Sequence, residues 1–356
     1  QVLPLQDCAN TSFRKSFFLS NDTIESISQF NTMDLGKLIV GRHKVKTAIA
    51  ETGFLLKLNG LAEVQWAQDY AVTDADKQVR IVSGVKLKAD QYLLSARVTS
   101  VTDPIYNKTL VIKVNPDGNI SWSKLISTDP VLDANAQVQL QALNESSDGS
   151  ILLCGTIAGD LNGTFTGQYG FVVKLADNGD LLFSKLFVSG DGSLNDIIGI
   201  FDEGSSILVF GMVEDGNCPG LDIRAMYTMS LNSIDGSIIG VHRYCFGQIP
   251  GINSFGEFRH NYEVVPLAEG FSFYGFLAEG GSGARDFLVA TYNSNGELVS
   301  AKSIKDPLIG HSYHNINVDQ NGTIVLVGQH PLSGLYTSIY NKGGLLLNQT
   351  EIDQEK

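Results

Sequence analysis

Residues 171–185 read FVVKLADNGDLLFSK, and this stretch decides the fold. An apolar segment, Phe171–Leu175, is followed by the turn residues Asp177–Asp180 and by a second strand-like segment, Leu181–Lys185. Asn, Asp and Gly tolerate the positive φ that a two-residue turn of the primed type needs. The stretch therefore predicts an antiparallel β-hairpin that is closed by a two-residue turn.

The hairpin recurs along the chain with a period of about 50–60 residues, which indicates a repeat architecture. Its copies begin at Phe54, Leu110, Phe171, Tyr227, Phe287 and Tyr336. A shorter hairpin precedes each copy, and its apolar strand ends in a small residue. These small residues are Gly41, Ala96, Gly155, Gly211, Gly275 and Gly328. Because the second repeat accepts alanine, we expect small size to matter there more than a special backbone angle.

Two hairpins per repeat give four antiparallel strands, which is the pattern of a β-propeller blade. A β-solenoid is the alternative, but its coils are usually only ~20–30 residues long. We predict an all-β protein with a single propeller over residues 24–356 and six blades, with seven blades left open. The expected blades cover 24–70, 77–126, 137–187, 195–246, 258–304 and 312–352. Residues 1–23 are expected to contribute an extra closing strand around Phe13–Leu19.

Charge and composition exclude several classes of partner. The formal net charge is −13, so a nucleic-acid backbone would be repelled. No run of eighteen apolar residues occurs, and we expect no transmembrane segment. The chain begins with Gln1 rather than Met, which we interpret as the end left by a removed signal peptide. The composition therefore favours an exported protein.

The four cysteines contain no CxxC pair, which argues against a zinc knuckle or a thioredoxin-like motif. Cys218 and Cys245 fall in one repeat and are a candidate disulfide, which an exported protein would permit. The spacing leaves open whether they pair.

The segment Gly170–Lys185, followed by the acidic strand start Asn195–Ile200, resembles the β-propeller repeats of bacterial secreted and cell-surface proteins. In those repeats a GFVAKLDxxGNxxWSK hairpin precedes an acidic strand. The resemblance implies export and a propeller, but no single activity. A weaker likeness, carried by Asp117–Trp122, is to quinoprotein-type repeats and to envelope scaffolds that share that propeller. Only Trp66 and Trp122 are present and the alanine-rich lead-in is missing, so we expect no cofactor.

The search for chemistry gives few candidates. No GxSxG elbow, HExxH motif or phosphate loop occurs, so we predict no catalytic residues and no metal ligands. His43 and His330 both follow the glycine that ends an inner strand, in repeats that would be neighbours around a closed ring. They are a candidate pair at one rim. The alternative is that each histidine only satisfies a hydrogen bond.

The long connections of the predicted blades emerge on one face, and loops on a rigid scaffold are where recognition usually occurs. Two of these loops carry aromatic and charged residues that are typical interface anchors. The candidate partner-binding residues are Phe255, Phe258, Arg259, Asp222 and Arg224. The alternative is that the aromatic residues pack only within their own loops.

These observations predict a non-enzymatic protein-interaction or scaffold subunit of a bacterial cell envelope. It would lie in the periplasm or at the surface of a Gram-negative bacterium, in association with an outer-membrane export or assembly complex. The alternative is a propeller that binds or acts on carbohydrate. A deep acidic pocket with clustered aromatic residues would favour carbohydrate, and a broad flat face would favour a protein partner.

Overall fold

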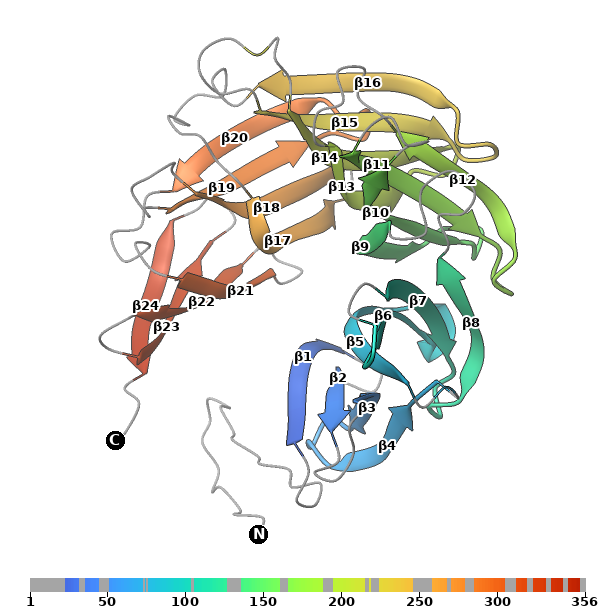
Figure 1. Ribbon diagram of the computed structural model, residues 1–356. Helices are drawn as coiled ribbons and strands as arrows, with labels where there is room; N and C mark the ends of the chain where they lie inside the picture. The colour runs from blue at the N-terminus through green and yellow to red at the C-terminus, as the bar shows by residue number, and fades with distance from the viewer. Residues whose placement is uncertain are drawn as a thin grey trace. The chain divides into compact units, whose positions relative to one another are not determined.

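A computed structural model provides the structure of the chain. It describes residues 23–31, 36–44, 51–72, 74, 76–103, 106–126, 136–160, 166–187, 195–214, 218, 224–245, 258–267, 270–278, 285–304, 312–318, 323–330, 334–341 and 345–352. These residues form six antiparallel sheets of four strands each, which Figure 1 shows in sequence from blue to red. The chain is an all-β, six-bladed β-propeller, as predicted. The expected closing strand at Phe13–Leu19 lies outside the described residues.

Each blade is a meander in which strands that follow one another in sequence are paired. The first three blades consist of β1 (Thr23–Asn31), β2 (Lys37–Lys44), β3 (Thr52–Leu58), β4 (Val64–Tyr70); β5 (Lys77–Lys86), β6 (Tyr92–Ser100), β7 (Asn107–Val114), β8 (Ile120–Ile126); and β9 (Gln137–Glu145), β10 (Ile151–Asp160), β11 (Thr166–Leu175), β12 (Leu181–Phe187). The last three consist of β13 (Asn195–Asp202), β14 (Ser206–Glu214), β15 (Arg224–Asn232), β16 (Ile238–Cys245); β17 (Phe258–Leu267), β18 (Gly270–Ala278), β19 (Arg285–Tyr292), β20 (Leu298–Ile304); and β21 (Ser312–Val318), β22 (Ile324–His330), β23 (Gly334–Tyr340), β24 (Leu346–Ile352). A short 3₁₀ turn, Lys88–Asp90, joins β5 to β6.

The turns between the third and fourth strands differ from the predicted two-residue type. In the second blade the Asn115 amide donates to the Asn119 carbonyl and the Gly118 amide donates to the Asn115 carbonyl. Gly118 has a φ of 88°. This is a type I turn followed by a left-handed residue, a three-residue hairpin loop that also matches strand twist. The same bonds close the turn at Ala176–Asp180. The glycine is therefore needed for its positive φ, one position after the turn itself.

The small residue at the end of each second strand has a structural reason. In the fourth blade Gly211 pairs with Ile197, immediately beside a bulge at Ile198 in β13. A Cβ atom at Gly211 would lie 2.4 Å from the carbonyl oxygen of Asp196. In the second blade Ala96 occupies the corresponding place opposite Ile81. Close approach of the bulged first strand therefore selects for small size.

The chain divides into two compact units. The first comprises residues 1–167 and 173–182, and the second 168–172 and 183–356, so the boundary runs through the third blade. The main core cluster of the first unit is largely aliphatic and includes Leu38, Leu55, Ile81 and Leu94. The main cluster of the second unit is rich in aromatic rings and consists of Ile198, Phe201, Leu208, Phe210, Met226, Phe271, Phe273, Leu288, Ala290 and Tyr292.

Candidate interaction surface

The loop residues expected to bind a partner fall mostly outside the described residues. Phe255 and Asp222 lie in segments that the structure does not describe. Phe258 and Arg259 begin β17, and Arg224 begins β15, where only the course of the strand is described. Their role as interface anchors therefore stays a prediction.

The two candidate rim histidines lie in different units. His43 is near the end of β2, and its Nδ1 atom lies 3.1 Å from the carboxylate of Asp69. Beside it, Arg42 forms an ion pair with Glu51 at 3.1 Å. His330 is the last residue of β22, and its side chain lies outside the described part. For His43, the structure agrees with the alternative of a satisfied hydrogen bond.

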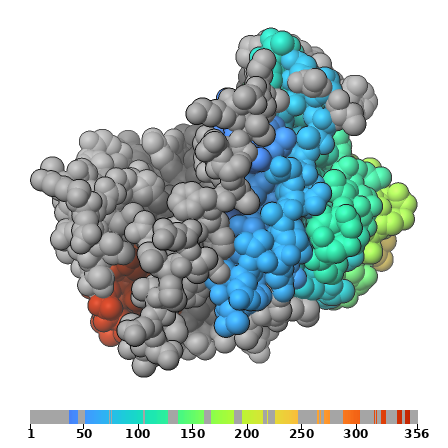
Figure 2. Space-filling view, turned by 90° about the horizontal axis from the view of Figure 1, so that it is seen from below, coloured from blue at the N-terminus to red at the C-terminus, as the bar shows by residue number. Residues whose placement is uncertain are grey.

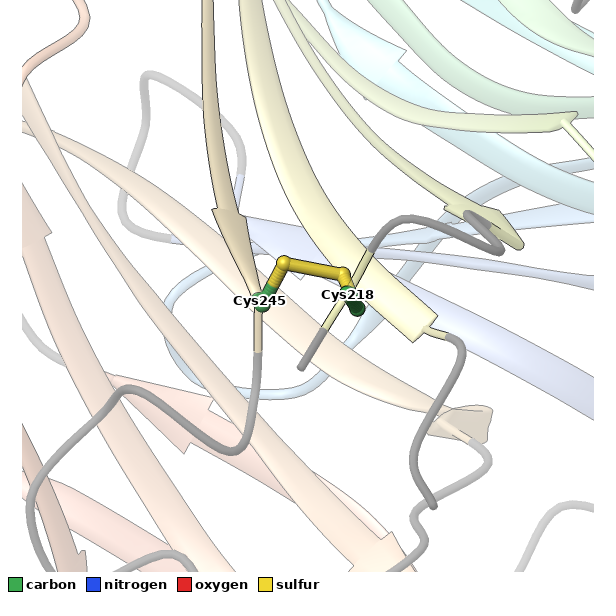
Figure 3. The surroundings of a disulfide bond; sticks show 2 residues. All are labelled: Cys218 and Cys245. Atoms are coloured by element: carbon green, nitrogen blue, oxygen red, sulfur yellow. A yellow bond between two sulfur atoms is a disulfide. The ribbon is translucent and has the colours of Figure 1, made fainter. Parts of the chain in front are cut away.

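The candidate disulfide is present. Cys218 and Cys245 are bonded, with their Cα atoms 5.5 Å apart. Figure 3 shows Cys245 at the end of β16 and Cys218 in the connection that follows β14. The bond joins two segments of the same blade, and it is typical of proteins that leave the reducing cytosol.

A lysine in the apolar third strand links successive blades of the first unit. The side chain of Lys113 is only 2% exposed, and its ammonium group contacts the Asp177 carboxylate in the turn of the next blade. Trp122 donates from Nε1 to the Asp177 carbonyl at 2.8 Å. Its ring also covers Gly179, where an added Cβ would lie 3.0 Å from the indole. The Lys, Asp, Gly and Trp of the repeat thus form one joint.

Related contacts occur at the other joint of the first unit, between the first and second blades. Lys57 forms a 3.2 Å ion pair with Asp90 of the second blade. Trp66 donates to the Pro116 carbonyl at 3.0 Å, and Tyr70 donates to the Gly118 carbonyl at 2.6 Å. The recurrent lysine was the sequence signal for these joints, because a charge within an apolar strand needs a partner. Sequence reasoning did not use it.

The joint between the fourth and fifth blades, in the second unit, uses hydroxyl groups and rings instead. Thr228 is fully buried and donates to the Gly296 carbonyl in the next blade at 2.6 Å. The Tyr244 hydroxyl accepts a 2.9 Å hydrogen bond from the Leu298 amide. Phe210 lies 4.9 Å from Phe273 between ring centroids. The register positions of Lys57 and Lys113 are held by Ser230 and Thr291 in the fourth and fifth blades, so these two positions have no lysine to pair with an aspartate.

One carboxylate, that of Asp76, joins two connections of the second blade through hydrogen bonds. Asp76 accepts hydrogen bonds from Lys77, from the Ser100 hydroxyl, and from the amide and hydroxyl of Thr102. The bonds from Lys77, Ser100 and Thr102 hold the pKa of Asp76 well below its usual range. The carboxylate is charged and fully used in this arrangement, which is structural.

Among the described residues, no group of three or more His, Cys, Asp or Glu side chains is placed to hold a metal ion.

Large apolar side chains are exposed mainly on the outermost strands and their turns. All but Val101 and Leu267 of the exposed large hydrophobic residues in the described part lie there. Figure 2 shows residues of the first and second blades, coloured blue to green, at the surface. Apolar residues scattered singly on a surface are ordinary. Only their regular placement along the outer strands is therefore informative.

The pattern follows a bulge at the start of the outer strand in the first, second, fourth, fifth and sixth blades. In the fourth blade Leu231 pairs with Ile238 and Ser230 with Gly240, so Ile239 is an extra residue. The same count makes Val299 and Leu347 the extra residues of the fifth and sixth blades. All three are more than half exposed, at 62%, 64% and 57%. In the first two blades the extra residue is polar, Gln65 or Ser121.

A bulge on an edge strand discourages accidental pairing with another sheet. The bulges therefore protect the backbone edge of the outer strands. In the second unit they also present a branched apolar side chain to solvent. We call the positions Ile239, Val299 and Leu347 the apolar bulge residues.

No helix in the described part of the chain is long and apolar enough to span a membrane. No protein-family model matches the sequence, and no curated protein matches it.

Solved structures show similarity of fold. An α-L-arabinofuranosidase of family GH93 from Fusarium graminearum, in complex with arabinobiose, is 9% identical, with a TM-score of 0.55 over 89% of this chain and 92% of that one. A streptogramin B lyase is 10% identical, with a TM-score of 0.48 over 94% and 88% of the two chains. Plexin A of Drosophila, in complex with Semaphorin 1b, is 9% identical, with a TM-score of 0.44 over 94% and 79%. At such identities the likeness concerns the propeller fold alone.

Proposed function

We propose that the chain is a non-enzymatic protein-binding subunit of a bacterial cell envelope, exported and held in an outer-membrane export or assembly complex. The observation that carries this proposal is the set of apolar bulge residues on the outer strands of the second unit. Branched side chains repeated at one position of consecutive blades cost solvation free energy while they are exposed. A partner protein that covers them would recover it.

The described polar groups support the same reading. Lys113, Trp122 and Asp177 serve the joint between two blades, and Asp76 holds two connections together. These groups act on the fold rather than on a substrate. The disulfide between Cys218 and Cys245 supports the export part of the proposal, because such bonds persist in oxidising compartments. The carbohydrate alternative has the fold of a glycosidase as its support, and a propeller fold hosts many functions.

The test is capture of partners from envelopes of the native host with matched outer-strand variants. Val299→Lys and Leu347→Lys place a charge on the apolar bulge residues, and Ser300→Lys and Asn348→Lys place it on the exposed polar neighbours. We expect the first pair to lose captured protein and the second pair to keep it. An interface anchor is commonly worth ~2 kcal/mol, about a thirtyfold change in affinity.

Two results would contradict the proposal. One is equal capture by all four variants, and the other is no captured protein together with binding or cleavage of polysaccharide by the unmodified chain. Phe255→Ala and Arg259→Ala serve as a separate arm for the predicted loop face. If those two fold but lose the partner while the outer-strand variants keep it, the partner binds through the loops instead.

A further inference from the structure

Eight Asn-x-Ser/Thr motifs occur in the chain, and in an exported protein such a motif is the acceptor for an N-linked oligosaccharide. An attached oligosaccharide is bulky and polar, so the fold tolerates it only at the surface. The structure describes the asparagine of four motifs, which are Asn107, Asn119, Asn144 and Asn348. The other four motifs begin outside the described residues, at Asn10, Asn21, Asn162 and Asn321.

In two of the described motifs the hydroxyl residue is buried in the fold. Thr109, two positions after Asn107, is 4% exposed, and its hydroxyl donates to the Val138 carbonyl of the next blade. Ser146, two positions after Asn144, is 1% exposed. A transferase that recognises the motif must reach both the amide and the hydroxyl group. The folded chain therefore hides these two motifs.

The motif that begins at Asn119 is open at all three of its positions. Asn119, Ile120 and Ser121 are exposed, and they lie where the turn after β7 leads into β8. Ser121 is the extra residue of the bulge, so it stands outside the regular strand pairing and its segment can bend into a transferase with little loss of pairing. Asn348 is exposed as well, but the side chain of Thr350 lies outside the described part.

The turn itself does not require an asparagine at position 119. In the second blade the Asn119 side-chain amide donates to the Asp117 carboxylate at 2.8 Å. In the third blade the two groups exchange places, and Asn178 donates to Asp180 at 2.9 Å. The position after the third turn residue is acidic in the first and fifth blades too, where it is Glu63 and Glu297. The second blade thus has an amide where three other blades have a carboxylate, and this amide begins an acceptor motif.

We propose that Asn119 is an N-glycosylation site, modified by a transferase that uses an oligosaccharide carried on a lipid pyrophosphate. The Asn119 Nδ2 atom forms a bond to the anomeric carbon of the first sugar, and the bond from that carbon to the pyrophosphate oxygen breaks. The lipid pyrophosphate leaves with the electron pair and takes up one amide proton. The inference rests on the export part of the proposed function and not on a partner protein.

Asp117 acts as a positioning residue for this reaction. The lone pair of an amide nitrogen is shared with the carbonyl group, so the nitrogen is a poor nucleophile. The backbone and side-chain amides of Asn119 hold the pKa of Asp117 below its usual range, so the carboxylate is charged at neutral pH. A charged acceptor makes a strong hydrogen bond with an N–H group. This bond fixes the orientation of the Asn119 amide and leaves more electron density on its nitrogen.

Peptide mapping by mass spectrometry tests the site, on chain purified separately from the envelope and the cytosol of the native host. Trypsin cuts after Lys113 and Lys124 and releases Asn119 in the peptide 114–124. We expect this peptide to carry an oligosaccharide on Asn119, and the peptides with Asn107 and Asn144 to have unmodified masses. An unmodified 114–124 peptide from the envelope would overturn the site and leave export standing. Unmodified chain found in the cytosol alone would contradict both.

Substitutions at the hydroxyl residue test whether the motif is what the transferase reads. Ser121→Ala keeps Asn119 in place and should lose the modification, whereas Ser121→Thr should keep it. Ser123→Ala is the matched control, because Ser123 is exposed on the same strand and lies outside the motif. An oligosaccharide that persists in Ser121→Ala, or sugar on Asn107 or Asn144, would overturn the assignment.

An exchange within the turn separates the site from the stability of the fold. The double variant Asp117→Asn with Asn119→Asp reproduces the pair of the third blade, so it should melt at the temperature of Ser121→Ala and carry no sugar on the 114–124 peptide. Asp117→Ala should lower the ratio of modified to unmodified chain about tenfold, as expected for loss of a charge-assisted hydrogen bond. Asp117→Glu should restore this ratio, and Asp180→Ala in the third blade should leave it unchanged. An unchanged ratio in Asp117→Ala would overturn the positioning role.

Discussion

The two units solve the same packing problem with different chemistry. Between blades of the first unit, a buried lysine such as Lys113 reaches an aspartate in the next turn, and a tryptophan covers the turn glycine. In the second unit Ser230 and Thr291 hold the register positions that Lys57 and Lys113 hold in the first. There, hydroxyl bonds and a cluster of rings fill the joint. The blade geometry thus fixes where a joint lies, and it does not fix which interaction closes it.

The bulge residues of the outer strands also differ between the two units. The extra bulge residue is polar in the first two blades and apolar in the last three. The second unit therefore combines an aromatic main core cluster with apolar bulge residues, whereas the first combines a largely aliphatic cluster with polar bulge residues in its first two blades.

The largest effect is expected in the aromatic core of the second unit. Phe210 is fully buried and lies 4.9 Å from Phe273 and 5.4 Å from Tyr292 between ring centroids. Phe210→Ala should lower the free energy of unfolding by about 3–5 kcal/mol, because it removes ring contacts and leaves a cavity. Leu94→Ala in the core of the first unit is the comparison, with about 2–5 kcal/mol expected. Denaturant titration measures both.

The lysine joint should respond unequally to loss of its two partners. Asp177→Ala leaves the ammonium group of Lys113 buried without its carboxylate, and should cost about 1–3 kcal/mol of stability. Lys113→Met leaves Asp177, which is 69% exposed, in contact with water. It should cost less than about 1 kcal/mol. If the lysine variant is the more damaging of the two, the ammonium group stabilises the joint through a contact other than the Asp177 carboxylate, such as the Asp177 carbonyl.

Single hydrogen bonds allow a direct comparison of the two kinds of joint. Thr228→Val removes the buried bond to Gly296 in the second unit, and Trp122→Phe removes the exposed bond to Asp177 in the first. Each should lower stability by about 0.5–1.5 kcal/mol. We expect the threonine to show the larger loss, because its unpaired carbonyl partner stays away from water. Thermal melting of both variants beside the unmodified chain would show the order.

The smallest effects are pH-dependent and opposite in sign. The hydroxyl and amide of Ser150, and then Lys174, hold the pKa of Asp148 below its ordinary 3.8. Asp148 therefore stabilises the fold above pH 3.8 and loses this effect as pH falls toward its folded pKa. Asp148→Asn should be less stable than the unmodified chain at pH 7, and the difference should vanish in strong acid.

In the second unit, burial and the neighbouring Asp202 raise the pKa of Glu203 above 4.5. Its protonated form favours the fold below pH 4.5, and this contribution disappears as pH rises through the folded pKa. Glu203→Gln should therefore melt slightly higher than the unmodified chain at pH 7 and equally at acid pH. Melting curves between pH 3 and pH 7 measure both variants. A lower melting temperature for Glu203→Gln at neutral pH would contradict the assignment.

Much of the fold was predictable because its signals are local. The continuous apolar runs that end in Gly41 or Gly211, and the turns around Gly118 and Gly179, predicted four-stranded blades, six of them favoured, and the structure has six. The turn type was wrong, because Asn, Asp and Gly suit several hairpin loops and only the hydrogen bonds distinguish them. The candidate partner loops stay predictions. The apolar bulge residues could not be found from sequence, because a bulge is defined by the pairing of two strands.

The sequence by itself determined the strands, the places of their turns and the need for small residues, since each depends on neighbours a few positions away. Only the tertiary structure decided that Lys113 meets Asp177, sixty-four positions along the chain, and that Cys218 bonds to Cys245. It also decided that Ile239 faces solvent while Phe210 is buried. Both are apolar residues in strands, and the physical difference is whether another blade lies over them.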